Sequence, residues 1–128
     1  MTHMTNPRET VDHLIRAINS GDLDAAVALY ETSGVMVVQP GSLARGTAEL
    51  RAALAGFIAL KPVLESRAEN VVEAGDVALY QSRWKLRGTD PAGQPVDLAG
   101  ESTDVLRRQE DGRWLIALDN PWGARLLG

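Results

Sequence analysis

The stretch Val96–Trp122, VDLAGESTDVLRRQEDGRWLIALDNPW, decides the fold. It predicts a long β-hairpin with arms at Val96–Arg108 and Trp114–Trp122, because the turn Glu110-Asp111-Gly112 between two β-rich runs is a strong hairpin signal. Side chains alternate between the two faces of a strand, so one face of the first arm carries Val96, Leu98, Gly100, Ser102, Asp104 and Leu106. This face is apolar apart from one hydroxyl and one carboxyl, as expected of a ligand pocket.

The second arm ends in polar residues. Alternation places Asn120 and Trp122 on the face of Trp114, Ile116 and Leu118, with Asp119 on the opposite face. Pro121 can disturb this register, and Asp119 would then face inward. We expect Asn120 and Trp122 to bind a ligand and leave the orientation of Asp119 open.

Three helices are expected before the sheet. The first is capped by Asn6, with Pro7 and Glu9 in the preferred positions, and ends at Ser20-Gly21. A second runs from Asp22 to a break at Ser33-Gly34. The third is capped by Thr47 and ended by Pro62.

Short β-rich runs fill the remaining chain. Val35–Val38 is stopped by Pro40-Gly41 and followed by a loop to Gly46. Strands are expected at Arg67–Glu73 and Val77–Arg87, and the second has Ala78, Tyr80, Ser82, Trp84 and Leu86 on one face. The order of helices followed by a curled antiparallel sheet indicates an α+β domain.

Composition limits the function. A chain of 128 residues predicts one domain over residues 1–128, and its net charge of −4 with scattered Lys and Arg argues against a nucleic-acid partner. It has no cysteine, and His3 and His13 alone cannot form a zinc site. We expect no metal and no cofactor, since P-loop and dinucleotide motifs are missing. The polar start Met1–Asn6 and the lack of a long apolar run predict a cytoplasmic protein without a membrane partner.

Several motifs together resemble the nuclear-transport-factor-2-like superfamily, which includes ketosteroid isomerases and SnoaL-like polyketide cyclases. They are Ile15–Tyr30 (IRAINSGDLDAAVALY), Val37–Pro40, Arg45–Leu50, Asp104–Arg107 and Gly112–Trp114. The resemblance covers nearly the whole chain. It implies a cone-shaped (cystatin-like) fold, in which a strongly bent, mainly antiparallel sheet is wrapped by three N-terminal helices around an apolar cavity, often in a homodimer.

The resemblance also bears on catalysis. Ketosteroid isomerases use an aspartate base with a tyrosine and a protonated aspartate as oxyanion donors. The position of the base is here Gln39 and that of the tyrosine is Leu14, so only Asp104 keeps its counterpart. Steroid isomerisation by that mechanism is therefore not expected, and a general base is missing unless Asp119 or an ionised Asp104 serves.

The predicted site has Asp104 as the catalytic acid or oxyanion donor and other polar and aromatic side chains as ligand-binding residues. For Asp104 the alternative is a structural carboxylate paired with an arginine, for Tyr80 and Trp84 simple core packing, and for Gln39 a loop cap. The ligand-binding set is Gln39, Tyr80, Ser82, Trp84, Ser102, Asn120 and Trp122.

Two functions remain open at this point. The first is a pocket for an apolar small molecule bearing a carbonyl or hydroxyl group, with isomerase, cyclase or dehydratase activity if it is an enzyme. The second is a non-catalytic homo-oligomeric association module, which would have a filled cavity. Ser82, Ser102 and Asp104 are more polar groups than a filled core tolerates without partners, which favours the pocket. The outward residues Glu101, Thr103 and Val105 are the expected dimer contacts.

Overall fold

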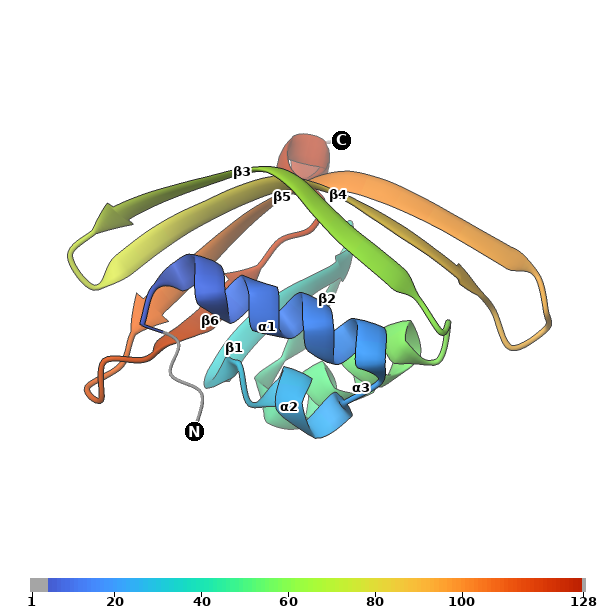
Figure 1. Cartoon of the computed structure of the whole chain (residues 1–128), viewed down its shortest axis with the longest axis horizontal. Coiled ribbons are helices and arrows are strands. Elements are labelled where there is room, and N and C mark those ends of the chain that lie inside the picture. Colours follow the sequence, from blue (N-terminus) through green and yellow to red (C-terminus); the bar gives the residue numbers. More distant parts are fainter. Residues whose placement is uncertain (1–4, 128) are drawn as a thin grey trace.

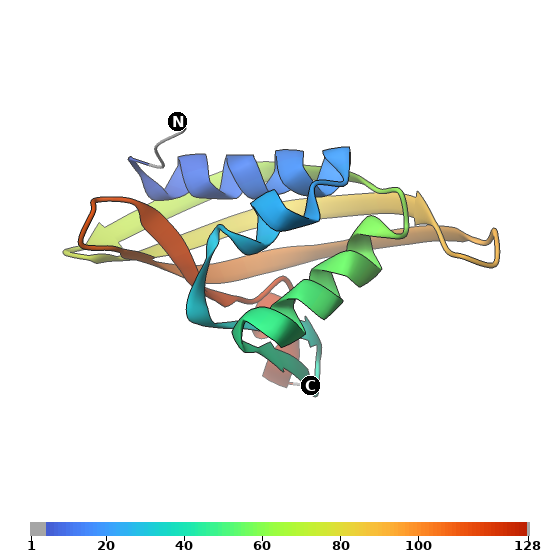
Figure 2. The same cartoon turned by 90° about the horizontal axis from the view of Figure 1, so that it is seen from below.

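The computed structural model describes residues 5–127 and has three helices against the concave face of one curved sheet (Figures 1 and 2). The helices are α1 (Pro7–Ser20), α2 (Leu23–Val27) and α3 (Gly46–Ile58). The strand order is β2-β1-β6-β5-β4-β3. The strands are β1 (Tyr30–Gln39), β2 (Ser42–Arg45), β3 (Val63–Ala74), β4 (Val77–Thr89), β5 (Pro95–Arg108) and β6 (Trp114–Asp119).

The predicted α+β cone is confirmed. β1 and β6 pair in parallel, and the other neighbouring strands pair antiparallel. A short 3-10 helix, η1 (Gly123–Leu127), lies on the convex side of the sheet, away from α1 (Figure 1). His3 and most of the Met1–Asn6 segment lie outside the described residues. Between residues 5 and 127, no helix is long and apolar enough to cross a membrane.

Helix α1 forms as its sequence predicts. The Asn6 side chain accepts a hydrogen bond from the Glu9 backbone N–H at 3.0 Å, and Gly21 closes the helix with a φ of 76°. Only glycine adopts this left-handed conformation at little cost. The Thr10 hydroxyl then donates to the Trp114 carbonyl at 2.7 Å, which ties α1 to β6.

The predictions for residues 22–46 were partly wrong. The second helix ends at Val27, and β1 already begins at Tyr30 and runs through Ser33-Gly34. Gly34 lies where the register of β1 against β6 shifts, so it permits an irregular strand and does not end a helix.

The expected loop before Gly46 contains the short strand β2, which pairs with β1 in a hairpin. Helix α3 begins at Gly46, and Thr47 does not cap it. The Glu49 side chain instead accepts a hydrogen bond from the Arg45 N–H at 2.9 Å.

The sheet strands are longer than the sequence patterns suggested. β3 begins at Val63 and β5 at Pro95, whereas β6 ends at Asp119 and not at Trp122. The β4–β5 pairing keeps one register from Val77–Arg107 to Thr89–Pro95, so the strict alternation predicted for these two strands is confirmed. Their inward residues line the cavity described next.

Candidate functional site

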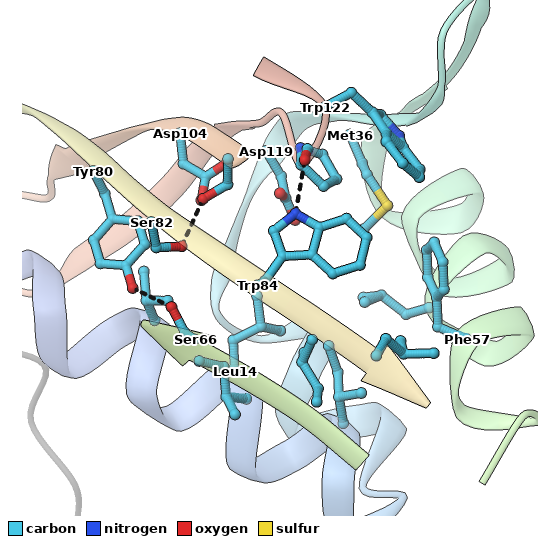
Figure 3. Close-up of a pocket in the computed structure, with 18 of the residues that line it drawn as sticks. Leu14, Met36, Phe57, Ser66, Tyr80, Ser82, Trp84, Asp104, Asp119 and Trp122 are labelled. Carbon is cyan, nitrogen blue, oxygen red and sulfur yellow. Dashed lines mark hydrogen bonds between the residues drawn. The ribbon is translucent and has the colours of Figure 1, made fainter. Parts of the chain in front are cut away.

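A cavity of about 110 Å³ lies between the concave face of the sheet and helices α1 and α3. A slightly larger apolar cavity, of ~150 Å³, is known to hold a benzene molecule, so this space has the scale of one small ring. Most of its wall is apolar, with α1 and α3 supplying Leu14, Leu54 and Phe57 and β1 supplying Met36. Figure 3 shows Leu14, Met36 and Phe57 around the polar groups that come from the sheet.

Two carboxyl groups and one phenol meet at one end of this cavity. Asp104 comes from β5, Asp119 from the end of β6 and Tyr30 from the start of β1. The Tyr30 hydroxyl donates a short hydrogen bond to Asp119, and Asp104 accepts the Asn120 backbone N–H at 2.8 Å. Both aspartates line the cavity and both are buried, with exposed fractions of 7% and 9%.

Burial and proximity shift the titration of these groups. Desolvation, followed by the charge of neighbouring Asp119, raises the pKa of Asp104 well above its usual value. Desolvation also raises the pKa of Asp119, but hydrogen bonds from Tyr30 and Asp104 oppose this rise. The two groups titrate as a pair, and the different surroundings favour the proton on Asp104 and the negative charge on Asp119.

A β-bulge turns Asp119 inward. Leu106 pairs with Ile116 and Val105 pairs with Leu118, so Ala117 is an extra residue in β6. The extra residue reverses the face of everything that follows it. The orientation of Asp119, which the sequence left open, is therefore inward, and the cause is this bulge at Ala117 before Pro121 is reached.

Asn120 is not among the residues that line the cavity. Its side-chain oxygen accepts the Trp122 N–H at 3.2 Å, and its amide donates to the Gly123 carbonyl at 3.3 Å. Asn120 thus fixes the turn after β6, and the ligand contact expected of it stays a prediction.

A second polar group lies along β4 and β5. Tyr80, Ser82 and Ser102 line the cavity as predicted, and the two serine hydroxyls are 2.9 Å apart. The Tyr80 hydroxyl donates to Glu69 at 2.6 Å and is 3.1 Å from the Ser66 hydroxyl. Desolvation, followed by the bond to Glu69, raises the pKa of Tyr80 and keeps it a neutral donor.

Glu69 was not anticipated from the sequence. β3 has one residue too many between Arg67 and Asn70, and Ala68 there has a φ of 55°. This bulge brings Glu69 to Tyr80, and the Arg8 guanidinium holds its other oxygen at 2.8 Å. The strand was predicted over Arg67–Glu73 without a bulge, so the sequence analysis did not identify Glu69.

Two tryptophans form the wall nearest the end of β6. The Trp84 indole N–H donates to the Pro121 carbonyl at 2.7 Å, and the Trp122 indole N–H donates to the Val38 carbonyl at 3.1 Å. Their rings meet edge to face with centroids 5.5 Å apart. A Cβ on Gly100 would lie 2.9 Å from Trp84, so the glycine makes room for this ring. Both tryptophans line the cavity, as predicted.

Gln39 does not reach the site. It is exposed at the last position of β1 and pairs with Ser42 across the tight hairpin, while Met36 is the β1 residue that lines the cavity beside Tyr30. The expected ligand contact of Gln39 therefore finds no support. Across residues 5–127, no three His, Cys, Asp or Glu side chains are grouped so as to hold a metal ion.

A bent sheet wrapped by three helices around a cavity defines the nuclear-transport-factor-2-like class of fold. Within this class, the chain belongs to the family with the SnoaL-like domain, whose model matches residues 11–116. No curated protein matches the chain.

Solved structures share the fold over most of their length. A ketosteroid isomerase-like protein from Erwinia carotovora atroseptica is 26% identical, with a TM-score of 0.73 and coverage of 88% of each chain. The epoxide hydrolase/cyclase-like enzyme SalBIII, which has a role in pyran ring formation in the polyether salinomycin, is 20% identical, with a TM-score of 0.70 and coverage of 88% of this chain and 85% of its own. A putative calcium/calmodulin-dependent protein kinase II association domain from Xanthomonas campestris is 21% identical, with a TM-score of 0.74 and coverage of 86% and 79%.

Proposed function

We propose that this protein is a proton-transfer enzyme for a small apolar compound with a carbonyl or ether oxygen. The observation that carries the proposal is the buried pair Asp104 and Asp119, one favoured as the acid and the other as the base, at one end of a largely apolar cavity. Pairs of titratable groups whose surroundings separate their pKa values are typical of acid–base sites.

The pair can act on a ketone in two coupled steps. The Asp119 carboxylate removes a proton from the carbon beside the carbonyl, and Asp104 gives its proton to the carbonyl oxygen, which forms the enol. Return of a proton to the same α-carbon, while the enol hydroxyl gives its proton back to Asp104, restores the ketone; return on the opposite face of that carbon gives its epimer. The apolar wall excludes water and strengthens both interactions.

The relatives support this class of chemistry without fixing the reaction. Their names include an isomerase-like protein and an epoxide hydrolase/cyclase-like enzyme. An acid that protonates a ring oxygen beside a base that activates the attacking group fits such reactions as well as enolisation. Asp104 therefore takes the role of acid in the proposal and Asp119 the role of base that the motif comparison left vacant.

Exchange of α-protons tests the proposal without knowledge of the natural substrate. Cyclohexanone in D₂O is incubated with the purified protein, and loss of its α-proton signal is followed by NMR. The native protein should accelerate exchange. Asp119→Asn and Asp104→Asn should each reduce the acceleration by a factor of ~10²–10⁴, the usual contribution of a positioned acid or base.

The same preparations give the control. Thermal unfolding shows whether each variant is folded, and Asp90→Asn removes an exposed carboxyl of the β4–β5 turn that is remote from the cavity in the fold. Equal exchange rates with folded native protein and both cavity variants would contradict the proposal.

We also propose that the protein forms a homodimer through the convex face of the sheet. One row of residues crosses five strands in register and is apolar throughout, with exposed fractions of 53% for Val72, 36% for Leu79 and 37% for Leu118. The row consists of Val72, Leu79, Val105, Leu118 and Val35. An apolar strip of this kind is common at interfaces. Beside it, Arg83 faces Glu101 at 3.4 Å, a mixed-charge border suited to a two-fold interface.

Leu79→Glu tests the dimer, because it places a charge within the row, between Val72 and Val105. Light scattering after size exclusion should show the native mass halved in the variant. Val63→Glu is the matched control, since Val63 is 57% exposed on β3 but lies at the other end of that strand from Val72. A dimer that survives Leu79→Glu would place the interface elsewhere.

A further inference from the structure

We propose that a cleft between α1 and β3 is an outer subsite for the substrate, and that Ser66 there accepts a hydrogen bond from a hydroxyl group on the substrate's side chain. The inference rests on the proposed function and adds to it the substrate class. The substrate would be a ring ketone whose ring lies in the inner cavity and whose neutral side chain carries a hydroxyl group into the cleft.

The outer cleft adjoins the cavity of the candidate site. It has a volume of about 400 Å³ and is lined by Asp12, Ile15, Arg16, Ser66 and Glu69. Ile15 and Ser66 also line the inner cavity, so these two residues form the boundary between the two spaces. The inner cavity has the scale of one small ring, and a substituent on that ring therefore has this adjoining space to occupy.

The cleft is a fixed part of the fold, because α1 is fastened to β3 on both sides of it. On one side, the Asn19 side-chain amide donates to the Leu64 carbonyl at 3.0 Å, and its oxygen accepts the Leu64 N–H at 2.7 Å. On the other side, the Arg8 guanidinium binds the Glu69 carboxylate at 2.8 Å. The remaining cleft residues lie between these two attachment points in both elements.

The direction of the hydrogen bonds makes Ser66 an acceptor. Glu69 is ionised in its pair with Arg8 and has no proton to give, so its 2.6 Å bond to Tyr80 uses the only proton of the Tyr80 hydroxyl. The Tyr80 oxygen is then the acceptor in its 3.1 Å contact with Ser66, and Ser66 donates to it (Figure 3). Ser66 therefore offers lone pairs and no proton to a ligand at the boundary.

The charges around the cleft favour a neutral side chain on the substrate. Two carboxylates, Asp12 and Glu69, are matched there by two guanidiniums, Arg16 and Arg8. An ionic side chain of either sign would gain no net attraction from this balanced set. Among neutral side chains, a hydroxyl gives Ser66 a donor, whereas a carbonyl places an acceptor against an acceptor, which is unfavourable.

Three ring ketones of one shape test this selectivity. The cyclohexanones carry a 1-hydroxyethyl, an acetyl or an isopropyl group at C4, and a second set carries the same groups at C3. Binding is followed by the fluorescence of Trp84 and Trp122, which line the inner cavity. In at least one set, the hydroxyethyl compound should bind about 5- to 10-fold more tightly than the other two, as one net hydrogen bond allows.

Two variants assign the preference to Ser66. Ser66→Ala removes the acceptor and should bring the three affinities close together. Tyr80→Phe frees the Ser66 proton, so the acetyl compound should now bind as tightly as the hydroxyethyl compound, while both remain ahead of the isopropyl compound. Loss of packing alone would not change the selectivity in this way.

Ser42→Ala is the control for the loss of a serine hydroxyl. Ser42 lies in β2, at the opposite edge of the sheet from β3. The affinity ratios of this variant should equal those of the native protein.

The outcomes separate the two proposals. Equal binding of the three compounds by the native protein, exclusion of all of them while cyclohexanone still exchanges, or a hydroxyl preference unchanged in Ser66→Ala would each overturn the outer subsite. In these cases the acid–base proposal stands on cyclohexanone exchange. No binding of any ring ketone together with no exchange would overturn both.

Discussion

Strands β4 and β5 are more regular than strands β1, β3 and β6. The regular strands supply the cavity wall, and the irregular ones supply the residues that orient its hydrogen bonds. β4 and β5 pair without a register shift and present Tyr80, Ser82 and Ser102 in simple alternation. Each of the other three strands contains a shift. Tyr30, Glu69 and Asp119 lie at or next to these irregularities. They orient the hydrogen bonds of the cavity's polar groups.

The comparison shows how a sheet can form a site that its pattern does not display. Regular strands give the wall, and bulges turn single polar side chains toward it. Such a polar group must be buried together with its hydrogen-bond partners. Burying a polar group without a partner costs ~2–7 kcal/mol of folding free energy. Among the described residues, no buried side-chain polar atom lacks a partner.

Gly34 offers the most direct way to disturb the irregular region. A Cβ there would lie 2.9 Å from the Glu31 carbonyl oxygen and 3.2 Å from the Ile116 carbonyl oxygen, and both are backbone atoms that cannot rotate away. We expect Gly34→Ala to lower the free energy of unfolding by ~2–3 kcal/mol, in the range of overpacked sites. Urea unfolding measures the change.

Gly56 is the matched control for this substitution. It lies within α3, and a Cβ there meets nothing within 4 Å. Gly56→Ala should stabilise the protein by ~0.5–1 kcal/mol, because alanine has the higher helix propensity. If Gly34→Ala and Gly56→Ala changed the free energy of unfolding by the same amount, Gly34 would not be closely packed at the β1 irregularity.

The sequence predicted the fold and the wall of the cavity well. Alternation along Val77–Arg87 and Val96–Arg108 was sufficient to place Tyr80, Ser82, Ser102 and Asp104 on one inward face, and the structure agrees. Helix α1 was predicted down to its capping residues, since Asn6, Pro7 and Gly21 act through local chemistry.

The remainder of the site depends on long-range pairing. Tyr30 was assigned to a helix because the break after Val27 carries no proline or glycine, and only pairing with β6 makes it a strand residue. The orientation of Asp119 depends on one extra residue opposite Leu106 and Val105. A periodicity argument assumes one register throughout a strand, so it cannot locate such an insertion.

Tyr30→Phe tests the irregular strands at the Asp104–Asp119 pair. The substitution keeps the ring and removes the hydrogen bond to Asp119, so we expect a loss of ~1–3 kcal/mol in stability, as for a lost bond to a buried charged group. The Tyr30 bond lowers the pKa of Asp119, and its loss should raise that pKa further. If Asp119 is the base, the acid limb of the exchange rate should move to higher pH. If the acid limb of the exchange rate stays at the same pH, Asp119 is not the base.

The expected effect of Asp104→Asn on stability depends on pH. Burial raises the pKa of Asp104 in the folded protein above the value of ~3.9 of an unfolded aspartate. The unfolded chain therefore releases this proton first. The contribution of Asp104 to stability is fully present below pH ~3.9 and is lost as pH rises toward the folded pKa.

Asparagine has the shape of the protonated acid but no proton to lose, so the variant should match the native protein near pH 4 and become relatively more stable at higher pH. The gain should grow as pH rises from about 4 towards 7, because burial raises the pKa of Asp104 above its unfolded value. Urea unfolding at several pH values measures it. Asp111→Asn should show the opposite sign, because hydrogen bonds from Arg113 lower the pKa of Asp111 and its contribution is lost as pH falls. If Asp104→Asn instead lost stability relative to the native protein as pH rises, as expected of Asp111→Asn, then Asp104 would be an ionised structural carboxylate. The proposed acid beside Asp119 would then be missing.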